Sequence, residues 1–194
     1  MKFVRTLWSC LAVVAFSAGM AFAQDNTPRA GVFGGFNQSY FASSPEIDTS
    51  AKQGYVFGGF VVLLRDKYFK IQPEVQVSQR KAIATYAGRE TTYTNTYFNL
   101  GLMFRSKIYK GLYSTSGVQF SLPLSADFAV PGGTVDNKEN IANDVSLVIG
   151  LGQQFGRIGI EGRWDSGLKG IEEVPIGGSV KRNRAFTFIG ILGF

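Results

Sequence analysis

Histidine is absent from the sequence, and cysteine occurs once, at Cys10. These two residue types supply the bases, nucleophiles and ligands of Ser–His–Asp hydrolases, cysteine enzymes and most zinc or haem sites. Their scarcity excludes those classes, and we predict that the protein is not an enzyme and holds no metal or other cofactor. Carboxylate or Ser–Lys catalysis in a membrane-embedded enzyme stays open as an alternative.

Charged residues are also scarce, at 18% of the chain, whereas soluble proteins usually approach about 25%. The 20 Lys and Arg exceed the 14 Asp and Glu, but no basic cluster is interleaved with aromatics, so no nucleic-acid partner is predicted. After residue 23 no run of about 20 apolar residues occurs, which excludes a transmembrane helix. Without disulfides, an exported chain must be stabilised by packing, by a membrane or by a closed sheet.

The N-terminal segment has the features of a secretory signal peptide. Basic residues precede an apolar stretch at residues 7–16, and Ala21-Phe22-Ala23 matches the small-x-small pattern that a signal peptidase cleaves. A retained anchor is disfavoured because a spanning helix needs about 20 apolar residues. We predict that residues 1–23 are a cleaved signal peptide and that residues 24–194 form one domain.

Alternation of apolar and polar residues is the main structural signal. From Ile71 to Ser78 it has no exception, as in a strand with one apolar and one polar face. About eight segments follow this period, near residues 30–40, 54–65, 68–80, 97–104, 112–124, 144–152, 158–165 and 184–194. In residues 54–65 both faces are apolar, which leaves the orientation of that strand open. Pro73 donates no ladder hydrogen bond, so we expect a bulge or a missing bond there.

The connections between these segments alternate in length. They are short at residues 65–67, 106–110 and 156, and longer at residues 41–53, 82–90, 126–143 and 167–181. No charged residue falls in the apolar register of any segment, as expected where a Lys or Arg facing lipid would cost about 2 to 4 kcal/mol. The pattern predicts an all-β fold, a closed antiparallel up-and-down transmembrane β-barrel of about eight strands. Such a barrel has long extracellular loops and no wide pore.

Two blocks of the chain resemble a known family. Residues 70–81 (KIQPEVQVSQRK) are similar to the LQPELLYSQKG strand of the porin-family outer-membrane β-barrel domain, in its PorT-like group. Residues 143–171 resemble the sixth and seventh strands of that family, through Gly150, Gly152, Arg163, Trp164, Gly167, Leu168 and Ile171. The chain departs from the family at residues 97–101, where the Glu and Pro of a Tyr-x-Glu-x-Pro motif are missing. The resemblance implies a small barrel in the outer membrane of a Gram-negative bacterium, and no single activity.

The polar faces of the strands would line the barrel interior if the apolar faces meet lipid. The candidate lumen residues are Gln72, Glu74, Gln76, Asp144, Glu161, Arg163 and Asp165. One interpretation is an ion or ligand site, and the other is a charge and hydrogen-bond network that fills the barrel. The second is favoured because side chains must occupy the lumen of an eight-stranded barrel.

Further residues are assigned to the membrane and the rim. Phe186, Phe188 and Phe194 in the last strand resemble an outer-membrane insertion signal, which makes the assembly machinery a predicted partner. A group of basic residues carries the hypothesis of contact with lipopolysaccharide phosphates, with solvated rim charge as the alternative: Arg80, Lys81, Lys181, Arg182 and Arg184. Four oxygen donors lack calcium-loop spacing and are interpreted as ordinary loop residues: Asp136, Asn137, Glu139 and Asn140.

The functional prediction is a structural, binding or surface-interaction role in the outer membrane, exerted through the long extracellular loops and in contact with outer-membrane lipid. The alternative is a soluble exported lipocalin-like barrel that turns its apolar faces inward around a small hydrophobic ligand. The polar register decides between them, because it is rich in Gly, Ser, Thr, Asn, Gln and Tyr and poor in Lys and Glu. Such residues suit a crowded lumen better than a soluble exterior.

Overall fold

The structure is a computed structural model. It describes residues 28–44, 48–86, 89–130, 133–136, 138, 141–170 and 180–194, so the predicted signal peptide lies outside the described residues. Within the described ranges, no helix has the length and the apolar character that crossing a membrane requires.

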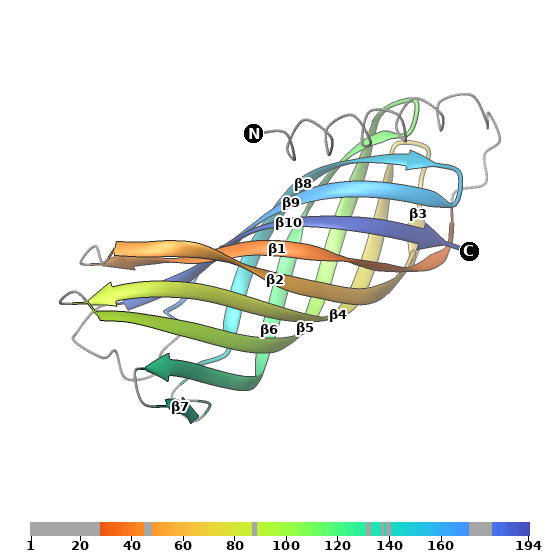
Figure 1. Ribbon diagram of the computed structural model, residues 1–194. Coiled ribbons are helices and arrows are strands. Elements are labelled where there is room, and N and C mark those ends of the chain that lie inside the picture. Colours follow the sequence, from red (N-terminus) through yellow and green to blue (C-terminus); the bar gives the residue numbers. More distant parts are fainter. Residues whose placement is uncertain are drawn as a thin grey trace, which may run out of the picture.

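Almost all described residues lie in β-strands, as the alternating pattern predicts. The strands are β1 (Ala30–Ser44), β2 (Asp48–Val61), β3 (Leu64–Arg65), β4 (Phe69–Tyr86), β5 (Arg89–Tyr109), β6 (Leu112–Val130), β7 (Gly133–Asp136), β8 (Asp144–Phe155), β9 (Ile158–Gly167) and β10 (Val180–Gly193). Eight of them are paired in the order β2-β1-β10-β9-β8-β6-β5-β4, and β4 pairs back to β2. β3 pairs with β4, and β7 pairs with β6. The predicted closed antiparallel barrel of about eight strands is confirmed (Figure 1).

Tight turns join the strands at one rim of the barrel, where β1 begins and β10 ends. Lys110 and Gly111 form a two-residue turn between β5 and β6, with φ of 32° and 86°. Positive φ at both positions is the geometry of a type I′ hairpin turn. Gly156, with φ of 60°, lies in the turn between β8 and β9. The connections at this rim, which we call the turn rim, are short as predicted, although residues 106–109 of the expected turn continue β5.

The opposite rim, where β1 meets β2 and β4 meets β5, differs from the prediction. Most of residues 41–53 and 82–90, expected to be loops, continue the strands, because β1 reaches Ser44 and β4 reaches Tyr86. Their polar residues are compatible with strands because the backbone pairs with a neighbour, as Thr85 does with Glu90. Figure 1 shows the β1–β2 and β4–β5 hairpins projecting from this end, which we call the hairpin rim.

The remaining two predicted loops are only partly described. In residues 126–143, β6 continues to Val130 and β7 follows as a short strand paired with it. Residues 171–179, the middle of the last predicted loop, lie outside the described residues. The expectation of loops is therefore wrong for most of the first two connections, whereas in the third it is wrong for residues 126–130, which belong to β6, and for residues 133–136, which form β7.

Pro73 lies in β4 beside a break in the ladder that joins β4 to β2 and β3. β2 pairs with β4 as far as Glu74. The pairing with β4 resumes in β3 at Ile71, where the register is shifted by one residue. The Leu63 amide donates to the Ile71 carbonyl, so Ile71 and Pro73, two residues apart, present their backbone groups to the same neighbour. The missing donor of Pro73 faces the break, while pairing with β5 continues through it. The irregularity expected at Pro73 is confirmed.

The two faces of the barrel wall differ in polarity. Many outward-facing side chains are large, apolar and exposed, among them Val32, Phe36, Val75, Leu100, Leu102, Phe120, Ile149, Ile160, Phe188 and Leu192. In β2, Phe57 is 65% exposed and Val56 only 4%, which settles the orientation that the sequence leaves open. An apolar exterior around a polar interior is the arrangement of a barrel in lipid. It is the reverse of a lipocalin-like barrel, so that alternative is not favoured.

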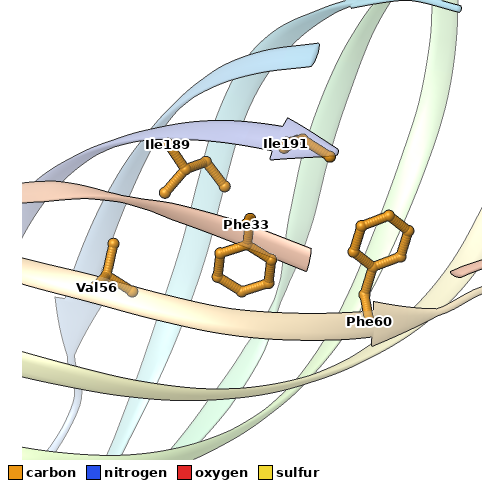
Figure 2. Packing of buried hydrophobic residues seen from close by; sticks show 5 residues of the cluster. All are labelled: Phe33, Val56, Phe60, Ile189 and Ile191. Atoms are coloured by element: carbon orange, nitrogen blue, oxygen red, sulfur yellow. The ribbon is translucent and has the colours of Figure 1, made fainter. Parts of the chain in front are cut away.

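Part of the inner face is nevertheless apolar. Figure 2 shows this cluster, formed by Phe33 of β1, Val56 and Phe60 of β2, and Ile189 and Ile191 of β10. Burying each such side chain contributes about 1.5 to 3 kcal/mol. The cluster is therefore an apolar core inside the barrel, and the inward faces of β4, β5 and β9 are left mostly to polar side chains.

Candidate functional site

Four charged side chains meet inside the barrel. Arg163 of β9 donates from Nη1 and Nη2 to both carboxylate oxygens of Glu74 of β4, at 2.6 and 2.8 Å, and from Nε to Glu161 at 2.8 Å. Arg105 of β5 donates from Nη2 to Glu161 Oε2 at 2.6 Å. All four side chains are buried, where an unpaired charge would cost several kcal/mol. Two positive and two negative charges make this ionic quartet neutral as a unit.

Neutral side chains complete the hydrogen bonding of the carboxylates. The Tyr113 hydroxyl donates to Glu161 Oε2 at 3.0 Å. The Gln72 amide donates from Nε2 to Glu74 Oε1 at 2.7 Å. Each carboxylate is thus held by arginine and by a neutral donor, as a buried anion requires.

The guanidinium groups of the quartet also stack on aromatic rings. The Arg105 guanidinium carbon lies 4.7 Å from the ring centroid of Tyr113 and 5.6 Å from that of Phe60. That of Arg163 lies 5.4 Å from the ring of Phe33. Such cation–π contacts are worth about 2 kcal/mol when desolvated. Because Phe33 and Phe60 belong to the cluster in Figure 2, the quartet packs directly against the apolar wall.

A second polar cluster surrounds Arg80. Its Nη1 lies 3.8 Å from Asp144 Oδ2, and its guanidinium carbon lies 5.5 Å from the ring centroid of Tyr97. Asn183 Nδ2 donates to Asp144 Oδ2 at 3.1 Å and to the Tyr97 hydroxyl at 3.4 Å. The contacts around Arg80 are longer than those in the quartet, so this cluster is the looser of the two.

The structure distributes the predicted lumen residues among separate contacts. Glu74, Glu161 and Arg163 meet in the quartet with Gln72, whereas Asp144 belongs to the Arg80 cluster. Asp165 accepts a hydrogen bond from Thr187 Oγ1 at 3.0 Å, and Gln76 donates to Gln119. The prediction missed Arg105. It could have been found, because Arg105 is the next inward-facing residue of β5 after Tyr97, Asn99 and Met103.

Neither a metal site nor a catalytic arrangement emerges from the described part of the chain. No group of three or more Cys, Asp or Glu side chains there is placed to hold a metal ion. Of the four donors considered for calcium, Asp136 accepts a hydrogen bond from the Lys138 amide at 2.9 Å. The other three, Asn137, Glu139 and Asn140, lie outside the described residues. In the quartet, arginine occupies the carboxylate oxygens that a general base would need free.

Arg80 does not lie where the lipopolysaccharide hypothesis requires. Its side chain is 5% exposed and faces Asp144 inside the lumen, because the alternation that turns Gln76 and Ser78 inward continues to residue 80. The hypothesis of a lipopolysaccharide contact is therefore wrong for Arg80.

The other basic candidates lie near the hairpin rim. Arg182 is exposed, Lys81 is half-buried, and Arg184 is half-buried and donates to the Ser166 hydroxyl. The backbone of Lys181 belongs to β10, but its side chain lies outside the described part of the structure. Among the predicted insertion residues, Phe186, Phe188 and Phe194 are exposed on the outward face of β10, and their role as a signal stays a prediction.

The outer edge of the apolar exterior is marked by a change in the outward-facing residues. The next residues beyond the exposed apolar side chains form cross-strand polar pairs, which are Gln38 with Gln53, Gln79 with Thr96, and Arg184 with Ser166. The rings of Tyr40 and Trp164 lie nearby, 6.2 Å apart between centroids, and aromatic residues gather at membrane interfaces. We call this row of pairs the polar row.

Solved structures include barrels of the same fold. Neisserial surface protein A has a TM-score of 0.56 at 11% identity, over 85% of this chain and 97% of that one. Ail, the attachment invasion locus protein of Yersinia pestis, has a TM-score of 0.47 at 12% identity, over 86% of this chain and 99% of that one. At these identities the likeness concerns the fold alone. No curated protein sequence matches the chain significantly.

The family assignment rests on the sequence. A family model described as outer membrane protein beta-barrel domain matches residues 22–172, well over half of the chain. The matched region holds β1 to β9, in which the apolar face is turned outward, and an outer-membrane location follows. Membership of the PorT-like group stays a prediction. By its sequence and its fold, the chain belongs to the outer membrane protein β-barrel domain family.

Proposed function

We propose that the protein is a structural and surface-interaction barrel whose hairpins at the hairpin rim contact a partner outside the cell. The observation that carries this proposal is strand length. β4, β5 and β6 contain 18, 21 and 19 residues, whereas a tilted strand crosses the hydrocarbon in about 9 to 11. Beyond the polar row, β4 continues from residue 80 to residue 86 and β5 begins seven residues before Thr96, so seven residues of each strand stand in water.

The projecting strands are supported as a stiff unit. Phe41 of β1 is buried against Ala82 of β4, and its ring meets that of Tyr93 of β5 edge to face, with centroids 5.4 Å apart. The Tyr93 ring lies 6.2 Å from that of Phe128 of β6. These contacts tie four strands together outside the membrane. A preorganised surface loses little conformational entropy on binding, which favours an interaction role.

We further propose that Arg182, Arg184 and Lys81 contact phosphate groups of lipopolysaccharide. Arg182 and Arg184 follow Phe186 and Phe188 on the outward face of β10, with Arg184 in the polar row. Cationic side chains just beyond an apolar exterior lie at the depth of lipid phosphates. The proposal also includes export through cleavage after residue 23 and insertion by the outer-membrane assembly machinery.

Trimming one hairpin tests the interaction role. Lys81 and Thr94 are directly paired, so residues 82–93 are replaced by Asn-Gly, which closes a two-residue turn. We expect the trimmed barrel to keep heat-modifiable electrophoretic mobility, while cells that express it lose most of their adherence to immobilised matrix proteins and to one another. Thr92→Ala is the matched control and should adhere as wild type. Equal adherence of trimmed and wild-type cells would contradict the proposal.

A further inference from the structure

A small cavity lies in the lumen where the quartet meets the Arg80 cluster. Its lining includes Asn37, Gln76, Arg80, Arg163, Asp165 and Thr187. Its volume is about 10 Å³ for the centre of a water-sized sphere, which is room for about one water molecule. The lining is mostly polar and carries charges of both signs, so the cavity is not of the kind that stays dry.

Asn37, one of the residues that line this cavity, has an unsatisfied acceptor. Its Nδ2 donates to the backbone carbonyl of Tyr55 at 3.2 Å and to that of Gln79 at 3.0 Å. These two bonds fix the orientation of the amide, because a flipped amide would set Oδ1 against two carbonyl oxygens. Oδ1 is therefore an acceptor, and it has no hydrogen-bond partner although Asn37 is buried.

Arg80, another residue of the cavity lining, has an unsatisfied donor. Its Nη1 is buried and has no hydrogen-bond partner, since Asp144 at 3.8 Å lies beyond bonding distance. A guanidinium stays charged in a protein, and a buried charged donor without a partner destabilises the fold. In the described part of the chain, no carboxylate compensates it by a direct hydrogen bond.

We propose that this cavity binds one ordered water, which accepts a hydrogen bond from Arg80 Nη1 and donates to Asn37 Oδ1 and to the Asp165 carboxylate. Water is the ligand that both donates and accepts, so one molecule satisfies both orphaned atoms. A monatomic anion does not donate to Asn37 and is repelled by Asp165. A metal cation is repelled by Arg80 and Arg163. The water joins Arg80 to Asp165 as a solvated ion pair, which distinguishes this part of the lumen from the directly paired quartet.

The test uses the full barrel in detergent. A crystal structure at about 1.5 Å resolution should show one water within about 2.7 to 3.2 Å of both Arg80 Nη1 and Asn37 Oδ1. Asn37→Leu removes the acceptor and fills the cavity, so the water peak should be lost. Gln38→Leu, on the outward face of the same strand, should leave the peak unchanged. Selectively labelled wild-type protein should show a magnetisation-transfer signal from water to the Arg80 guanidinium, which keeps the test valid if Asn37→Leu fails to fold.

Each contrary outcome overturns the proposal. An empty cavity would show that no ordered water binds there. An Arg80 side chain that donates directly to Asp144 or Asp165 would show that no water is needed to satisfy it. Crystals soaked in sodium bromide provide a further check, because an anomalous peak in the cavity would show an anion site in place of a water site. Persistence of the same water peak in Asn37→Leu would show that Asn37 does not hold it.

Discussion

Arg163 and Glu74 are 89 residues apart in the sequence and form a two-point ion pair inside the barrel, with N–O distances of 2.6 and 2.8 Å. The pair joins β9 to β4, two strands that are not neighbours in the wall. It exists only when the barrel has closed, because closure brings the two strands to face each other. The ion pair therefore links the packing of the lumen to the completion of the sheet.

Removing one partner of this pair should destabilise the barrel strongly. Arg163→Leu leaves Glu74 buried with the Gln72 amide as its hydrogen-bond donor and Arg105 Nη2 4.0 Å away, and breaking a buried pair in this way costs about 3 to 5 kcal/mol. Urea unfolding of the refolded barrel measures the loss. The double variant Arg163→Leu with Glu74→Leu removes both charges and should recover part of the lost free energy. A single variant as stable as wild type would show that the ion pair contributes nothing.

A charge placed on the lipid face should impair assembly. Leu102 and Thr94 both lie on the outward face of β5, but Leu102 is in the apolar exterior and Thr94 stands beyond the polar row. Leu102→Arg should cost about 2 to 4 kcal/mol if Leu102 lies near the bilayer midplane and reduce the heat-modifiable form in outer-membrane fractions. Thr94→Arg should assemble normally. Equal assembly of both variants would place the membrane boundary elsewhere.

The β5–β6 turn should depend on glycine at its second position. Gly111 has φ of 86°, and a Cβ there would collide with the carbonyl oxygen of Gln154. We expect Gly111→Ala to cost about 1 to 3 kcal/mol through backbone strain. Gly190→Ala is the control, since a Cβ on that outward glycine meets nothing closer than 3.9 Å. Thermal unfolding of the two refolded variants, compared with wild type, provides the measurement.

Neutralising two arginines tests the proposed lipid contact. In wild type, added lipopolysaccharide should raise the unfolding temperature of the purified barrel more than a phosphate-free glycolipid does, because phosphate attracts the guanidinium groups. The double variant Arg182→Gln with Arg184→Gln should lose most of that difference and keep its mobility shift on heating. An equal rise in the variant would assign these arginines to solvated rim charge.

The fold was predictable from the sequence because its two signals act everywhere along the chain. Period-2 alternation sets the faces of each strand, and the uncharged apolar register indicates lipid as the exterior. At Pro73, the lack of a single amide hydrogen was enough to predict the position of a ladder break. The orientation of β2 was not predictable, because Val56 and Phe57 are equally apolar and only the cluster with Ile189 decides between them.

The sequence predicted which side chains face the lumen, but it did not predict which of them contact one another. Register places Glu74, Glu161 and Arg163 inside, but which side chains meet depends on strand stagger around the closed barrel, which alternation does not contain. Arg80 shows the converse failure. Its position near a predicted loop suggested the rim, whereas the strand continues past it and turns it inward. Polar composition indicated loops at the hairpin rim, although Thr and Asn pair there as strand.

The ladder break at Pro73 also affects where the strand pairing of the closed barrel opens locally. A second register shift interrupts the β2–β4 pairing between Lys52 and Val56. Between the two irregularities, β2 pairs with β4 only over the short stretch from Val56 to Phe60. The seam between β1 and β10 runs unbroken from Gly31 to Ser44. Amide hydrogens along β2–β4 should therefore exchange with deuterium sooner than those between β1 and β10. The closed sheet would then open between β2 and β4 sooner than between β1 and β10, the first and last of its strands.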